Sequence, residues 1–386
     1  MTAIVAVLLC PFALLTAFFV IEVLSGLPRG RSRTKGSGAS AVVVVPAHDE
    51  AAVIGDTLTR LTDALGANMR ALVVADNCTD ATAERARQAG VDVLERHDAE
   101  RRGKGHALAF AAEHLAADPP DVFAVLDADC AIDRDSLQAL VASAGSGRPS
   151  QTINLLRPDP QGSPLVQLST FAFVLKNLVR QRGLQRLAGR VHLTGTGMAM
   201  PYGLFRASSE VRSSIVEDLA LGLELAEQGT PPRLVTDAIV WSGGSTEQGT
   251  LIQRRRWEGG FLATALRYGP RLVGRSLRRR DLRGVLAGLD LLIPPLALFA
   301  LLNTAVLAVA IALTLLGKAL WWPVIGQGML LGAAGAAVLI AWAREGRRFV
   351  SLPVLARVPL YVLWKVPLYL GLARRGTPKE WLRTGR

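Results

Sequence analysis

The chain has 386 residues, enough for one large domain or two, and half of them are hydrophobic while 20% are charged. Its mean hydropathy of +0.29 is high for an ordinary soluble enzyme, and its charged fraction is high for a bundle of membrane helices alone. The composition therefore predicts a chain in which a polar domain and membrane segments occupy separate parts of the sequence.

The net charge of +12 comes from basic residues gathered in short runs. The runs lie at 29–35, 254–256, 275–283, 344–348 and 374–375. Most of them flank apolar segments, which is typical of the cytoplasmic ends of membrane helices and of contact with anionic lipids. No nucleic-acid-binding motif accompanies the charge, so we predict no nucleic-acid partner. Cys10, Cys78 and Cys130 form no CxxC pair, which argues against a disulfide framework or a zinc site and favours a reducing, cytosolic setting.

The first segment, 3–21, contains no charged residue and is followed by Glu22 and then by a basic run. A signal peptide would carry its positive charge before the apolar run. Because the charge comes afterwards, we predict an uncleaved transmembrane helix within 1–28, with its carboxyl end in the cytoplasm. A basic linker rich in Gly and Ser follows at 29–40.

From 41 to about 241, short apolar runs of the buried-strand type alternate with helical stretches. The runs are 41–45, 71–75, 91–94 and 122–126. This βαβ rhythm predicts an α/β domain over 41–250 with a doubly wound, mostly parallel, Rossmann-like sheet. Such sheets bind ligands at the carboxyl ends of their strands. The acidic residues that fall there are Asp49, Glu50, Asp76, Asp127 and Asp129.

Asp127 and Asp129 end an apolar strand, one residue apart. Two carboxylates so placed can hold a hard divalent cation, Mg²⁺ or Mn²⁺, that neutralises a diphosphate, although such pairs also simply face solvent or cap a helix. Glu50 and Asp76 follow the first two strands, where a carboxylate can accept hydrogen bonds from a nucleobase or a ribose. Helix capping is the alternative for both. These four carboxylates follow successive predicted strands in chain order, and this arrangement favours ligand binding over capping.

The glycine-flanked turn 102–106 places Lys104 ahead of a helix, where a lysine can bind a phosphate. A solvated loop is the alternative.

Glu217 and Asp218 begin another helical stretch. Group transfer to a hydroxyl needs one base to take its proton, and Asp218 is the candidate. A carboxylate is also favoured at a helix N-terminus for structural reasons alone, and Asp218 can satisfy both roles.

The segment from Gln253 to Trp257 reads Gln-Arg-Arg-Arg-Trp. Arg256 can bind a diphosphate and stabilise its developing charge, and Trp257 offers a flat ring for stacking on a sugar. A membrane-anchoring basic turn is the alternative.

The loop 192–198, with Thr196 and Gly197, is rich in small residues that permit close approach by a ligand.

Two further apolar blocks, 291–316 and 320–343, each exceed the ~20 residues that span a bilayer. We predict a transmembrane hairpin over 284–345 with both outer ends cytoplasmic. Within the tail, 346–386, the stretch 350–372 carries three prolines and internal charges, which favours an interfacial or re-entrant helix over a third span. The stretches 164–186 and 251–272 fit either helices on the membrane surface or ordinary amphipathic helices on the sheet. For the segment 251–283, which holds Gln253 to Trp257, we predict an interfacial helix.

In this order the motifs resemble those of the family 2 glycosyltransferases, specifically the membrane-anchored branch that includes cellulose and hyaluronan synthases. The resemblance covers about 41–260 and extends to the placement of the flanking membrane segments. It implies a GT-A-type domain, an inverting transfer and a nucleotide-diphosphate sugar as donor, with UDP as the usual nucleotide.

The resemblance also assigns roles. Asp218 matches the last Asp of the family's Thr-Glu-Asp, where this chain has Val216 in place of Thr, and Gln253, Arg256 and Trp257 match its Gln-x-x-Arg-Trp. The loop 194–197 resembles the acceptor-side loop. The expected site therefore has catalytic Asp218, Glu217 and Arg256; donor-binding Pro46, Ala47, Glu50, Asp76, Lys104, Asp127 and Asp129, the last two also holding the metal; and acceptor-binding Thr196, Gly197, Gln253 and Trp257.

The membrane part departs from the polymerising synthases, which build a channel from several more helices. About three spans favour transfer to a lipid-linked or membrane-presented saccharide, in polysaccharide or glycolipid biosynthesis, at a bacterial-type inner (plasma) membrane with the catalytic domain in the cytoplasm. One alternative is a processive polysaccharide synthase that acts as a homo-oligomer or with a partner exporter. The other is a membrane-bound nucleotide receptor without catalysis.

Overall fold

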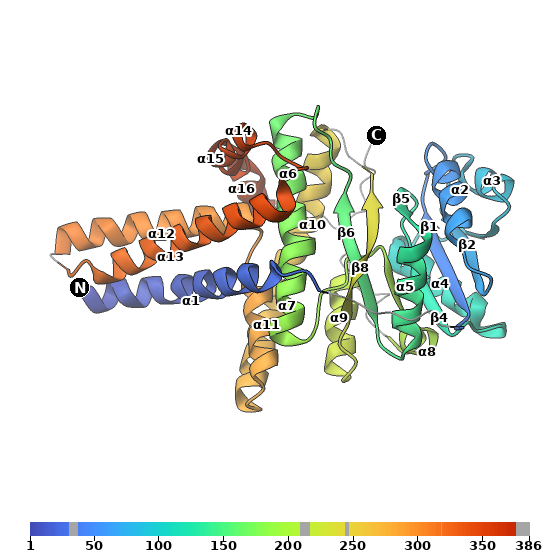
Figure 1. Cartoon of the computed structure of the whole chain (residues 1–386), viewed down its shortest axis with the longest axis horizontal. Coiled ribbons are helices and arrows are strands. Elements are labelled where there is room, and N and C mark those ends of the chain that lie inside the picture. Colours follow the sequence, from blue (N-terminus) through green and yellow to red (C-terminus); the bar gives the residue numbers. More distant parts are fainter. Residues whose placement is uncertain (31–37, 209–216, 244–246, 318, 376–386) are drawn as a thin grey trace.

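The computed structural model of the chain describes residues 1–30, 38–208, 217–243, 247–317 and 319–375, and at 217, 247–256 and 375 it describes the backbone only. An α/β domain is built on one sheet, and apolar helices from both ends of the chain form a bundle beside it (Figure 1). A layer of further helices lies between the sheet and the bundle (Figure 1).

The sheet has eight strands in the order β3-β2-β1-β4-β7-β6-β8-β5. They are β1 (Ala41–Ala47), β2 (Met69–Asp76), β3 (Asp92–Arg96), β4 (Val122–Val125), β5 (Cys130–Ile132), β6 (Ser150–Leu156), β7 (Met198–Pro201) and β8 (Arg233–Ser242). The first four strands in this order are parallel, and β7 is antiparallel to both of its neighbours. Strand β8 is parallel to β6 and antiparallel to β5. The predicted α/β class is confirmed.

Helices cover both faces of the sheet. In this domain they are α2 (Ile54–Ala64), α3 (Thr82–Gln88), α4 (Lys104–His114), η1 (Leu115–Ala117), α5 (Arg134–Gly145), α8 (Tyr202–Ala207) and α9 (Glu217–Glu227). Val43 and Val45 of β1 pack with α2 and α5 on one face, while Val42 and Val44 pack with α4 and α9 on the other. Because side chains alternate along a strand, the unbroken apolar run of β1 is what a doubly covered strand requires.

Within the described residues, three helices are long and apolar enough to cross a membrane: α1 (Thr2–Gly26), α12 (Leu296–Gly317), and α13 (Trp322–Ala341) with its π-helical extension η4 (Trp342–Gly346). Helix α1 packs against both of the others, and Figure 1 shows the three side by side, pointing away from the sheet. Asn303 Oδ1 accepts hydrogen bonds from Thr16 (3.2 Å) and from Gln327 (2.8 Å), so one buried amide links all three helices.

The apolar block predicted over 291–316 is divided in the structure. Helix α11 (Leu282–Leu292) ends before α12 begins at Leu296, and Pro294 and Pro295 lie between them. Proline has no N–H for the helical ladder, which explains the break. The part before the break packs against α10 (Glu247–Arg278) instead of joining the bundle. The predicted hairpin, 284–345, thus starts with a helix that is not a candidate span.

The layer between sheet and bundle consists of α6 (Pro164–Val174), the π-helical stretch η2 (Leu175–Arg180), α7 (Gln181–Ala188), α10 and α11 (Figure 1). Three short helices follow the bundle: α14 (Leu352–Leu355), α15 (Val358–Trp364) and α16 (Val366–Arg375). A proline stands in the first turn of α14 and of α15, a position where its missing N–H costs nothing. Prolines at these spacings keep the segment 350–372 from forming one long helix.

Candidate active site

One cavity of about 920 Å³ lies between the carboxyl ends of the parallel strands and the helical layer. Eight of the predicted residues line it, although they come from six separate parts of the chain. They are Pro46, Glu50, Lys104, Asp127, Asp129, Thr196, Asp218 and Trp257. The turn after β4 supplies Asp127 and Asp129, and α10 supplies Trp257.

The remaining predicted residues lie elsewhere or outside the described part. Asp76 is buried away from the cavity wall, where its Oδ1 accepts a hydrogen bond from Arg96 Nη1 at 2.6 Å. Ala47 is buried in β1, and Gly197 lies behind the cavity wall. The side chains of Glu217, Gln253 and Arg256 lie outside the described residues.

Lys104, Gly195 and Asp218 meet at one point of the wall. Lys104 Nζ forms an ion pair with Asp127 and donates a hydrogen bond to the carbonyl oxygen of Gly195 at 2.7 Å. Gly195 has φ +80°, and a Cβ there would lie 3.1 Å from Asp218 Oδ2 and 3.2 Å from Lys104 Nζ. Glycine is therefore needed both for the backbone conformation and for the space between the carboxylate and the ammonium group.

Asp218 stands in the first turn of α9, and its Oδ1 accepts a hydrogen bond from the Leu219 N–H at 2.7 Å. Burial raises the pKa of its carboxyl above the usual range, and the positive charges of Lys104 and Lys176 offset that effect only in part. A more basic carboxylate at the wall of a cavity is a better proton acceptor than an ordinary aspartate.

Asp127, Asp129 and Cys130 bring one ligand atom each to within 4.8 Å of one another. The Asp127 N–H donates to Thr196 Oγ1 at 3.0 Å, which fixes the start of this turn. Burial raises the pKa of the Cys130 thiol well above its usual range, so the sulfur stays protonated. The ligand atoms on offer are thus carboxylate oxygens, and this donor set fits a hard cation such as Mg²⁺ or Mn²⁺.

Gln151 of β6 organises the small-residue loop, a role that the sequence pattern did not reveal. Its Nε2 donates to the carbonyl oxygen of Thr196 at 2.9 Å, and its Oε1 accepts from the Thr194 N–H at 2.9 Å. Gly197, with φ +58°, packs so closely that a Cβ would lie 2.1 Å from Thr152 Oγ1. Gly197 therefore shapes the loop from behind while Thr196 faces the cavity.

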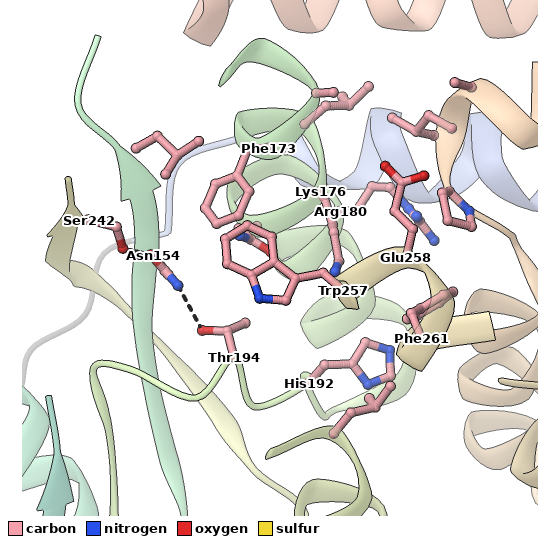
Figure 2. Close-up of a pocket in the computed structure, with 18 of the residues that line it drawn as sticks. Asn154, Phe173, Lys176, Arg180, His192, Thr194, Ser242, Trp257, Glu258 and Phe261 are labelled. Carbon is pink, nitrogen blue, oxygen red and sulfur yellow. Dashed lines mark hydrogen bonds between the residues drawn. The ribbon is translucent and has the colours of Figure 1, made fainter. Parts of the chain in front are cut away.

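Aromatic side chains form another part of the cavity wall. Figure 2 shows Trp257 beside Phe173, and their ring centroids are 6.1 Å apart. Lys176 Nζ lies 5.3 Å from the ring centroid of Phe261. Phe173 and Lys176 belong to the segment 164–186, for which the sequence left open whether the helix covers the sheet or the membrane surface. In the structure this segment forms one wall of the cavity.

A buried group of charges joins α1 to this wall. Arg180 donates to Glu22 Oε2 at 2.6 Å and to Asp290 Oδ1 at 2.5 Å, and His192 Nε2 lies 2.5 Å from Asp290 Oδ2. Burial raises the pKa of Asp290, but Arg180 and His192 outweigh it and hold that pKa well below the usual range. Because unpaired buried charges are costly, the apolar helix α1 is fixed to the cavity wall by these contacts.

The sequence profile of the family described as "Glycosyltransferase like family 2" matches residues 39–260, more than half of the chain. No curated protein matches this chain. Among solved structures, a mannosyltransferase from Pyrobaculum calidifontis in complex with GDP-Man and Mn²⁺ is similar over 97% of this chain and 95% of its own, with 16% identity and a TM-score of 0.55. A glucosyl-3-phosphoglycerate synthase from Mycobacterium tuberculosis, solved with Mn²⁺, UDP and glucosyl-3-phosphoglycerate, is similar over 54% of this chain and 71% of its own, with 19% identity and a TM-score of 0.34.

The predicted family and the GT-A-like fold are thus confirmed, the first by the profile and the second by the similarity along nearly the whole length of the Pyrobaculum enzyme. Asp127, Asp129, Asp218, the loop at Gly195 and Trp257 lie within the matched residues and share one cavity. The chain belongs to the glycosyltransferase like family 2.

Proposed function

We propose that the protein is an inverting hexosyltransferase that moves a sugar from a nucleotide-diphosphate sugar to a lipid-linked or membrane-presented saccharide, in polysaccharide or glycolipid biosynthesis. UDP is the favoured nucleotide. The observation that carries the proposal is the extent of the cavity, whose wall includes Asp127, Asp129 and Asp218 and also residues of the apolar helices α12 and α13. A polar donor and an apolar acceptor can meet in such a space.

In the proposed reaction, Asp218 takes the proton of the acceptor hydroxyl while its oxygen attacks the anomeric carbon. The bond from that carbon to the diphosphate oxygen breaks as the new bond forms, so one displacement inverts the configuration. The raised pKa of Asp218 supports its role as proton acceptor. Its position next to Gly195 and Lys104 supports a place close to the leaving group.

Asp127 and Asp129 would hold Mg²⁺ or Mn²⁺, and when bound the ion supplies positive charge that stabilises the departing diphosphate. Mn²⁺ accompanies GDP-Man in the similar Pyrobaculum enzyme, which supports this assignment. Lys104, paired with Asp127, orients that carboxylate and adds a positive charge beside it. Arg256 remains a proposal for the diphosphate, because its side chain lies outside the described residues.

For the remaining donor-binding residues, the proposal differs by position. Pro46 and Glu50 line the cavity and are proposed to contact the donor directly. Asp76 and Ala47 are buried beside that edge of the sheet, so their proposed part in nucleotide binding is to support the strand ends. On the acceptor side we propose Thr196, Gln253 and the flat ring of Trp257, with Gly197 shaping the loop.

The three candidate spans support a protein of the inner (plasma) membrane with the sheet on the cytoplasmic side. The decisive experiment is a donor panel of nucleotide sugars on detergent-purified protein, scored by released nucleoside diphosphate with and without Mn²⁺. Release from one donor, with the sugar found on a lipid or saccharide, supports the proposal. A receptor without catalysis would bind nucleotide and release nothing, and a processive synthase would yield a ladder of polymer lengths.

A further inference from the structure

The cavity has an apolar limb that leads away from the carboxylates. We define this limb by Leu296, Ala300 and Asn303 of α12 and by Leu331, Gly335 and Leu339 of α13, all of which line the cavity. At about 1.5 Å per residue, it follows α12 for roughly 10 Å and α13 for roughly 12 Å. Both helices are candidate membrane spans, so the limb enters the part of the chain that would lie in the bilayer.

The limb is open on the side of α13. A Cβ on Gly335 would meet no atom within 4 Å, so the space beside α13 is open at this position. The amide of Asn303, at the inner end, is engaged by Thr16 and Gln327. A space with such walls offers water few partners, and an apolar chain fills it at lower cost.

Lys176 lines the same cavity as the apolar limb and Asp218. It is exposed although its neighbours Leu175 and Asn177 on η2 are buried, because its side chain lines the cavity. Figure 2 shows it beside Trp257 and Phe261, and its charge acts on Asp218. A ligand bound at Asp218 is therefore exposed to the positive charge of this ammonium group.

The other cations on this side of the cavity are placed differently. Arg180 is buried between the carboxylates of Glu22 and Asp290, and Lys365 is buried against Glu258. The side chain of Lys176 is exposed and lines the cavity, where a ligand can contact it.

We infer that the acceptor is a lipid that carries an anionic phosphate close to its reacting hydroxyl. Its phosphate binds Lys176, its hydroxyl reaches Asp218, and its hydrocarbon chain occupies the apolar limb. This inference rests on the proposed function and names its acceptor class. In the transfer step the acceptor hydroxyl gives its proton to Asp218 and its oxygen bonds to the anomeric carbon, which leaves the donor diphosphate. The phosphate of the lipid keeps all its bonds.

The first test uses purified protein, the donor found in the panel with a radiolabelled sugar, and lipids extracted from the membranes of the protein's own cells. The extract is separated by anion exchange into neutral and anionic lipids before use. Label that enters the anionic fraction supports the inference. Mild acid then releases sugar joined to a lipid diphosphate, and mild alkali cleaves the acyl esters of a glycerophospholipid, so the two sources of phosphate are told apart.

The second test uses matched variants. Gly335→Leu places a side chain in the apolar limb. Gly332→Leu places the same side chain on the same helix, at a position that does not line the cavity. A Cβ meets no atom within 4 Å at either position. We expect at least a tenfold fall in kcat/KM for the anionic lipid with Gly335→Leu and wild-type values with Gly332→Leu. Lys176→Ala should lower that kcat/KM roughly 10- to 100-fold, as expected for loss of a charge-assisted contact, and Lys176→Arg should restore most of it.

Three results would overturn the inference: label only in neutral lipid, label only in water-soluble product, or equal losses for Gly335→Leu and Gly332→Leu. If donor is hydrolysed but no lipid is labelled, the acceptor class is wrong while the transferase proposal stands. If no donor is turned over under any condition, the proposed function itself fails.

Discussion

Lys365, in the turn between α15 and α16, forms a buried ion pair with Glu258, the residue that follows Trp257 in α10. The Tyr369 hydroxyl donates to the other oxygen of Glu258 at 2.8 Å. The burial of Tyr369 and the charge of Glu258 raise the pKa of this phenol, which therefore stays protonated as a donor. The helices after the bundle are in this way fixed to the cavity wall that carries Trp257.

Removing one member of this pair should destabilise the protein. Lys365→Ala leaves the Glu258 carboxylate buried without its cation, a change that typically costs about 3–5 kcal/mol. Tyr369→Phe removes one hydrogen bond and should cost roughly 1 kcal/mol. Thermal unfolding in detergent measures both. The exposed pair of Arg70 and Asp118 is the control, and a drop in Tm as large for Arg70→Ala as for Lys365→Ala would contradict the argument.

Asp218→Asn should abolish sugar transfer while preserving nucleotide binding. The amide has nearly the shape of the carboxylate but accepts no proton, and loss of a general base typically lowers kcat about 10²- to 10⁴-fold. Single-turnover transfer and a binding titration with nucleoside diphosphate separate the two effects. Asp237→Asn, at an exposed position of β8, serves as the matched control. Transfer by Asp218→Asn near the wild-type rate would place the base elsewhere.

The pH profile of transfer should report the same carboxyl. The base must be deprotonated, so kcat/KM falls as pH drops through the pKa of Asp218. This fall is the acid limb of the pH profile. Because burial raises the pKa, the acid limb lies above the ordinary aspartate value of about 3.9. Because the charge of Lys104 lowers that pKa, Lys104→Met should shift the limb to still higher pH. An acid limb that does not move in this variant would show that Lys104 does not act on the titrating group.

Gly195→Ala should impair both stability and activity. The residue has φ +80°, where an L side chain costs roughly 1–2 kcal/mol, and the new methyl would press against Asp218 and Lys104. Gly90→Ala is the matched control, since Gly90 has φ +74° and a Cβ there meets no atom within 4 Å. We expect a loss in Tm for both variants, larger for Gly195→Ala, and a loss of transfer only for Gly195→Ala. Equal transfer by both would mean that the space beside Asp218 is not used.

Mn²⁺ binding should depend on Asp127 and Asp129. Asp129→Asn keeps the shape of the side chain and removes one charge, so the affinity for Mn²⁺ in the presence of nucleoside diphosphate should fall at least tenfold. Electron paramagnetic resonance of free Mn²⁺ measures this without recourse to activity. Asp80→Asn tests the other acidic group, formed by Asp49, Cys78 and Asp80. A larger loss for Asp80→Asn than for Asp129→Asn would move the metal to that turn.

Much of the architecture could be predicted from local pattern. The apolar runs at 41–45 and 122–126 became β1 and β4 because an unbroken apolar run fits a strand that is covered on both faces. The spans α1, α12 and α13 were predictable because their length and composition match a bilayer. Pro294 and Pro295 were visible too, yet hydropathy alone joined two helices that these prolines separate.

The sequence by itself determined the order of the carboxylates along the strand ends, the family and the candidate membrane spans, since each depends on neighbouring residues or on fixed spacing. Only the tertiary structure decided that Asp76 pairs with Arg96, that Gln151 holds the loop of Thr196, and that the cavity continues from Asp218 into the space beside Gly335. These facts depend on side-chain directions from segments far apart in the chain. No local pattern encodes them, because packing sets which of many distant partners a side chain meets.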